Sequence, residues 1–78
     1  MNNNGWIRSE DKLPEDDEAV LVIANGRAGN TKLTNAYLMA EYYKDEGFVL
    51  MEYPTAENFT ASWWMPLPEP PEGYGYEH

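Results

Sequence analysis

Six consecutive apolar residues, Ala19 to Ala24, leave few folds open to this chain. The run is too short for a buried helix, and it contains no polar position that would mark a face turned to water. It therefore predicts a central β-strand that is covered on both faces. The rest of the sequence has no long stretch with the 3.6-residue period of an amphipathic helix, so no packed helix is available as the cover.

Three more segments have the composition and the periodicity of strands, namely Asn35–Tyr43, Phe48–Tyr53 and Thr60–Met65. Asp45–Gly47 is predicted to form a tight turn between two of them. Asn25–Thr34 contains two glycine-containing turn signals and is predicted to be a long loop. The predicted fold class is therefore all-β, a small antiparallel meander of four to five strands with a minor helical turn near the N-terminus.

At 78 residues the chain has room for one domain. We expect residues 1–5 to be a disordered N-terminus, residues 6–71 a single β domain and residues 72–78 a mobile C-terminal tail. Three apolar side chains at or before the first predicted strand are expected in the core: Trp6, Leu13 and Leu21. Trp63 and Trp64 are adjacent on a predicted strand and should therefore point to opposite faces of the sheet.

The predicted strands carry apolar residues on both faces, and this pattern limits the architecture. Such a sheet must either curl on itself or pack against a second copy of the chain. The chain has no cysteine, so no disulfide can support so small a core. We therefore favour a homo-oligomer, and a self-contained curled sheet is the alternative.

The residues on which most catalytic and metal sites depend are missing. Cysteine is absent, and the only histidine is His78, the last residue. No serine or threonine therefore has an internal histidine to activate it, and no zinc-type ligand set is available. Glu15–Glu18 could contact a hard cation, but four consecutive acids point in different directions, and a solvated turn is the favoured interpretation. We expect no enzymatic activity, no metal and no cofactor.

Fourteen acidic residues against five basic ones leave a net charge of −9. Nucleic-acid phosphates and anionic lipids repel such a chain, so neither direct nucleic-acid binding nor membrane binding is expected. No apolar run approaches the length of a membrane span. Met1–Gly5 has neither the basic residues nor the apolar core of a signal peptide.

One long segment, between Ala19 and Ala40, contains no acidic residue at all. It carries Arg27 and Lys32, two of the five basic residues, in the predicted glycine-containing loop. Glycines allow the backbone to approach a ligand closely, and successive turn N–H groups can bind an anion. We expect Arg27, Asn30 and Lys32 to contact phosphate, and a flexible hairpin of ordinary turn residues is the alternative.

Three segments resemble a known family. Trp6–Pro14 together with Ala19–Val22 is similar to the "WISVxDRLP…VLV" start of the DUF551 family. Trp64–Pro71 resembles its "HWMPLPEPP" ending, and Ala40–Phe48 is similar to its "AYYDGGxW" hairpin. Trp63 stands where the family has a histidine, so any role of that histidine does not carry over.

The resemblance implies that Trp64, at the position of the family tryptophan, belongs to the core. The family is common in phages and prophages and has no established general activity. The resemblance therefore implies a viral or prophage accessory protein that acts in the cytoplasm of a bacterial host, and it supplies no mechanism.

Two functional hypotheses follow. The first is an anti-defence module that sequesters a small phosphorylated molecule, such as a nucleotide immune signal, at the subunit junctions of an oligomer. Arg27, Asn30 and Lys32 would hold its phosphate, and Trp63 and Tyr43 would stack on its base. The alternative is an acidic inhibitor that occupies a basic surface of a host defence protein, or a structural accessory protein of the phage.

Overall fold

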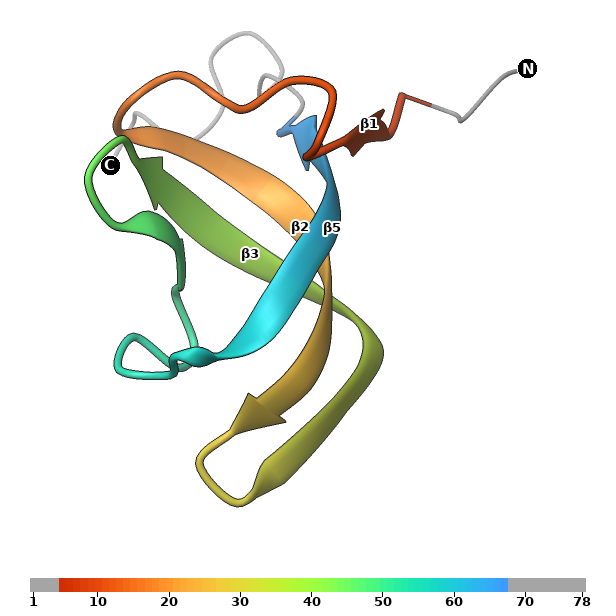
Figure 1. Cartoon of the computed structure of the whole chain (residues 1–78), viewed down its shortest axis with the longest axis vertical. Helices are drawn as coiled ribbons and strands as arrows, with labels where there is room; N and C mark the ends of the chain where they lie inside the picture. Colours follow the sequence, from red (N-terminus) through yellow and green to blue (C-terminus); the bar gives the residue numbers. More distant parts are fainter. Residues whose placement is uncertain (1–4, 68–78) are drawn as a thin grey trace, which may run out of the picture.

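A computed structural model describes residues 5–67 of the chain. Five strands form one antiparallel sheet in the order β1-β5-β2-β3-β4 (Figure 1). The strands are β1 (Ile7–Arg8), β2 (Glu18–Ala28), β3 (Thr31–Tyr43), β4 (Gly47–Leu50) and β5 (Asn58–Pro66). The described residues contain no helix, which confirms the all-β fold class. The N-terminus expected to be disordered, residues 1–5, lies outside the described residues except for Gly5, and the tail expected to be mobile, residues 72–78, lies wholly outside them.

The predicted helical turn after β1 is a single hydrogen-bonded turn. The backbone N–H groups of Asp11 and Lys12 both donate to the carbonyl of Arg8, at 3.0 and 3.1 Å. Leu13-Pro14 follows at once, and the residue before a proline avoids the helical conformation. The turn therefore does not extend into a helix.

The strands β2, β3 and β4 follow one another as a meander, whereas β5 crosses to the other side of β2. β2 is consequently paired along both edges, with β3 and with β5. Figure 1 shows that the sheet is strongly curled, so that the β4 side bends towards β5 without closing a barrel. This pairing confirms that β2 is the central strand. Its inner side chains, such as Val20 and Val22, are fully buried, but Leu21 and Ile23 on the opposite face are only half-buried, so residues 5–67 do not supply the expected cover on both faces.

One face of the curled sheet, the inner face, holds the core. Its buried side chains come from β2, β3, β4 and β5 and from the start of the β2–β3 hairpin, and the largest fully buried ones are Leu50, Val20 and Val22. The complete buried cluster consists of Val20, Val22, Ala24, Ala28, Leu33, Ala40, Leu50, Ala61 and Trp64. Four of these nine are alanines. Because alanine side chains are small, the parts of the curled sheet that face one another across the core can lie close together.

The prediction of a long loop over Asn25–Thr34 is wrong. β2 runs on to Ala28, β3 begins at Thr31, and only the two residues of the turn lie between them. Asn25 and Gly26, which resemble a turn signal, lie inside β2 opposite a β-bulge: the two-position step from Ala24 to Gly26 on β2 is matched by a three-position step on β3, from Ala36 to Leu33. Asn35 on the opposite strand has a φ of 48°, and its N–H donates to Oδ1 of Asn25 at 2.8 Å.

The predicted strand Phe48–Tyr53 is also shorter than expected, because β4 ends at Leu50. Met51 still donates its N–H to the carbonyl of Met39 at 3.0 Å, but the chain then bends away towards β5. This departure creates the loop that leads into β5.

The four side chains expected in the core have different environments. Trp64 is 3% exposed and lies in the core, and its indole Nε1–H donates to the carbonyl of Lys12 at 2.8 Å. Leu13 is 48% exposed, because this hydrogen bond holds the segment over Trp64 so that Pro14 is buried in its place. Trp6 and Leu21 are half-buried and are not part of the core cluster.

Candidate functional site

The three predicted phosphate contacts lie together on the β2–β3 hairpin. Arg27 pairs directly with Lys32 across the two strands, so their side chains point to the same face, and both are exposed. Asn30 occupies the adjoining two-residue turn and is also exposed. Two neighbouring cations on one exposed face could both contact a phosphate group. The backbone of this pair, however, belongs to paired strands rather than to a glycine-containing loop.

The two predicted stacking residues lie away from this hairpin within one chain. Trp63 pairs with Ile23, four positions before Arg27 on β2, or about 13 Å along the strand. Tyr43 is at the far end of β3, eleven positions from Lys32, or roughly 35 Å along the strand. A single nucleotide bound to one subunit could not reach Tyr43 and the basic pair together.

The surroundings of these residues are also acidic or already occupied. Arg27 lines a hollow that contains the carboxylates of Glu52 and Glu57. The ring of Trp63 has the guanidinium of Arg8 at 5.2 Å from its centroid, and Arg8 is in turn paired with Glu10 at 2.8 Å. One face of the Trp63 ring is therefore covered by a cation of the same chain.

Tyr43 is engaged by a neighbouring carboxylate. Its hydroxyl donates to Oε1 of Glu41 at 2.6 Å. This hydrogen bond, with smaller contributions from burial and from the negative charges of Glu41, Asp17 and Glu46, raises the pKa of Tyr43 to about 12. A phosphorylated ligand would meet these acidic groups if it stacked on the Tyr43 ring.

We expect one of the six tyrosines to ionise near pH 12 in an ultraviolet titration. Because the pKa of Tyr43 is higher in the folded state than its ordinary value of 10.0, its contribution to stability is complete below pH 10. That contribution disappears as the pH rises from 10 to about 12. Tyr43→Phe should remove the late transition, and Glu41→Gln should move it towards pH 10. A late transition that survives Tyr43→Phe would assign it to another tyrosine.

The acidic turn before β2 has a structural role. Within Glu15–Glu18, the N–H of Glu15 donates to Oε1 of Glu18 at 2.8 Å. Oδ1 of Asp16 accepts the N–H of Lys44 at 2.8 Å, and this bond links the turn to the β3–β4 connection. No group of three His, Cys, Asp or Glu side chains that could hold a metal occurs in residues 5–67. The same residues contain no helix that could cross a membrane.

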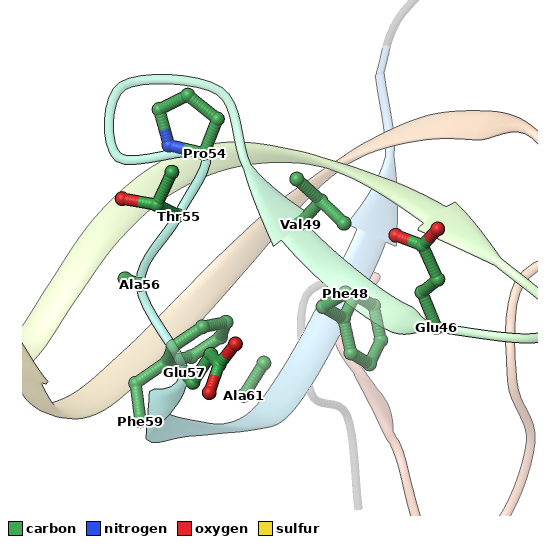
Figure 2. Close-up of a pocket in the computed structure, with 9 residues that line it drawn as sticks. All are labelled: Glu46, Phe48, Val49, Pro54, Thr55, Ala56, Glu57, Phe59 and Ala61. Atoms are coloured by element: carbon green, nitrogen blue, oxygen red, sulfur yellow. The ribbon is translucent and has the colours of Figure 1, made fainter.

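A hollow opens where the curled sheet fails to close, between β4 and β5 (Figure 2). We call it the seam hollow; its volume is about 610 Å³. Its walls are Glu46, Phe48, Val49, Pro54, Thr55, Ala56, Glu57, Phe59 and Ala61. The lining combines two partly buried phenyl rings with two exposed carboxylates and contains no basic residue.

The sequence contains no local sign of the seam hollow. Phe48 and Phe59 lie on strands at opposite sides of the sheet order, and Glu46 and Glu57 resemble ordinary turn and loop residues. Only the curl of the sheet brings the four side chains around one space. The hollow is therefore a candidate site that the sequence-based interpretation missed.

The family model described as "Protein of unknown function (DUF551)" matches residues 5–72 of the chain. The match covers all three segments on which the resemblance was based. No curated protein matches the chain significantly, and no solved structure does so either. The candidate sites must therefore be interpreted from their own chemistry.

Proposed function

Since this chain belongs to the DUF551 family, for which no function is known, we propose from its own geometry that it is a non-enzymatic binding protein that docks on a basic surface of another protein. The observation that carries the proposal is the seam hollow, whose lining is both aromatic and acidic. The proposal corresponds to the acidic-inhibitor alternative of the sequence interpretation.

The chemistry of the seam hollow suits a lysine or arginine side chain of the partner. Such a side chain has an apolar stem and a charged head. The stem would lie against Phe48 and Phe59, which are partly buried and contribute apolar surface and ring faces for a cation. The head would meet the exposed carboxylates of Glu46 and Glu57 at the rim.

The overall charge favours the same kind of partner. A net charge of −9 raises the rate of encounter with a basic protein surface and opposes encounter with phosphate-rich ligands. The phage or prophage setting implied by the family resemblance makes a bacterial defence protein the partner that we propose. In that setting, the chain would act as an inhibitor by covering a basic groove.

The nucleotide-sequestering hypothesis is the second candidate. It is favoured by one specific observation, the side-by-side placement of Arg27 and Lys32 on an exposed hairpin. It requires a second subunit to supply the stacking ring, because Tyr43 lies at the other end of β3 from the basic pair.

The proposal predicts that N-acetylarginine methylamide, a small guanidinium probe, binds in the seam hollow. In an NMR titration, amide shifts are expected at residues 46–49 and 55–61. The double variant Glu46→Gln/Glu57→Gln should weaken binding about tenfold, because two exposed charge contacts are each worth a fraction of a kcal/mol to about 1 kcal/mol. The matched control is Asp11→Asn/Glu15→Gln, which changes the net charge equally at exposed positions outside the hollow.

Three outcomes would count against the seam hollow. The probe could shift other residues, it could bind the double variant as well as the original chain, or the control variant could weaken binding equally. Cyclic and linear nucleotides titrated in the same way test the second candidate. Shifts at Arg27 and Lys32 that disappear in Arg27→Glu/Lys32→Glu would favour sequestration instead.

A further inference from the structure

The face of the sheet opposite the core, which we call the outer face, carries a regular array of apolar side chains. Directly paired residues of antiparallel strands point to the same face, so the strand register defines the array. One row runs through Trp63, Ile23 and Tyr37, and the next through Met65, Leu21 and Met39. Each row crosses β5, β2 and β3 in that order, and all six side chains keep some exposure to water.

The outer face is most open on its β3 side. Tyr37 is 67% exposed and Met39 44% exposed. Met51, which is 41% exposed, joins them in one hollow, because its backbone is hydrogen-bonded to Met39. Three of the four large apolar side chains that are exposed in residues 5–67 therefore gather at this place, and the fourth, Leu13, is not among them.

The N-terminal segment partly covers the outer face, over both β5 and β3. The ring of Trp6 meets that of Tyr37 edge to face, with 5.9 Å between centroids and an angle of 78° between planes. Arg8 lies over Trp63. These contacts hold Tyr37 and Trp63 in position, but they leave Tyr37 and Met39 open to water.

The charge pattern identifies which partner suits this face. Two copies of a chain with a net charge of −9 repel one another, and the repulsion is weakest where acidic residues are absent. The segment between Ala19 and Ala40, which supplies the β2 and β3 parts of both rows, contains no acid. Residues 58–66, which form β5, contain none either. The two apolar rows thus contain no acid on a strongly acidic chain, although Glu41 and Glu52 border them on the β3 side.

We propose that two copies of this chain pack through their outer faces, sheet against sheet, to form a dimer. Apolar sheet faces pack about 10 Å apart with interleaved side chains, and a two-fold axis lets the same array serve both partners. Tyr37, Met39 and Met51 become buried in this arrangement. The proposal is independent of the proposed function, because the seam hollow lies between β4 and β5 and shares none of the six array residues.

The test is sedimentation equilibrium over a range of protein concentrations up to about 200 µM, where weak dimers are populated. A dimer of about 18 kDa is expected, twice the 9.0 kDa of one chain. Its dissociation constant should fall as salt rises from about 0.05 to 0.5 M, because salt screens the repulsion between the two acidic subunits.

Met39→Glu is expected to raise the dissociation constant at least tenfold, since it places like charges in a symmetric apolar interface. Leu13→Glu is the matched control, because Leu13 is exposed to nearly the same degree as Met39 but lies off the outer face. Both positions are already in water, so both variants should fold, and circular dichroism checks this. A chain that remains a 9.0 kDa monomer throughout overturns the proposal, and so does a control that dissociates as readily as Met39→Glu.

Discussion

Gly26→Ala is expected to abolish or nearly abolish folding of this chain. Gly26 has a φ of 135°, a region that residues with a side chain rarely adopt. An added Cβ would collide with the carbonyl oxygen of Asn58 and would lie 2.6 Å from the Cα of Phe59. Both are backbone atoms of β5 and cannot rotate away, so relief requires β5 to move off β2.

The cost of Gly26→Ala combines backbone strain of about 1–3 kcal/mol with overpacking of a similar size. A single core in a domain of this length rarely supplies more than about 3–5 kcal/mol in total. Urea or thermal unfolding followed by circular dichroism should therefore show little or no cooperative transition.

Gly29→Ala is the matched control for this prediction. Gly29 also has a positive φ, 61°, but an added Cβ there would meet nothing within 4 Å. Only the left-handed conformation is penalised, at about 1–2 kcal/mol. A normal unfolding midpoint for Gly26→Ala, or equal losses in the two variants, would contradict the close approach of β5 to β2.

Trp64→Ala should destabilise the chain by about 3–5 kcal/mol, the range measured when large aromatic side chains are removed from cores. Trp64 is 3% exposed and supplies the largest ring of the buried cluster. Its indole also donates the hydrogen bond that ties Lys12 to the sheet. The variant therefore loses both core volume and the anchor of the segment before β2.

Trp63→Ala provides the comparison, because it removes the same side chain from the adjacent position on the opposite face. Trp63 is only partly buried, so its removal leaves no enclosed cavity and should cost clearly less. Trp64→Phe should fall between the two, since it keeps much of the ring but loses the hydrogen bond to Lys12. Urea unfolding curves at one protein concentration give the order, with Trp64→Ala showing the lowest midpoint or no cooperative transition, and a larger loss for Trp63→Ala would reverse the assignment of faces.

The spacing of apolar residues predicted most of the strands, because this spacing is a property of neighbouring residues and does not depend on the rest of the fold. Ala19 to Ala24 is apolar on both sides and does occupy the strand that is paired along both edges. Trp63 and Trp64 do lie on opposite faces, as neighbours on a strand must. The error over Asn25–Thr34 arose because an Asn-Gly pair favours a turn but can also lie inside a paired strand, here opposite a bulge in β3. Which of the two occurs depends on whether a partner strand continues alongside.

The candidate sites were less predictable than the strands. Arg27 and Lys32 could be grouped from sequence because they are near one another in the chain, and the hairpin register does pair them. Tyr43 could not be placed, because β3 proved to be a thirteen-residue strand that carries it to the far end. The seam hollow had no sequence signature, since its two phenyl rings come from strands that do not pair.

The amino-acid order alone determined that residues 5–67 form a β-sheet without a helix, with apolar residues on two faces and an acid-free central segment. Alternation and charge are set by neighbouring residues, so they can be identified in the sequence. The tertiary structure decided that β5 crosses to pair with β2 and that the sheet curls around an alanine-rich interior. Both features depend on contacts between segments that are distant in the sequence. They give the sheet a buried inner face and an apolar outer face, and they leave an acidic and aromatic hollow between β4 and β5.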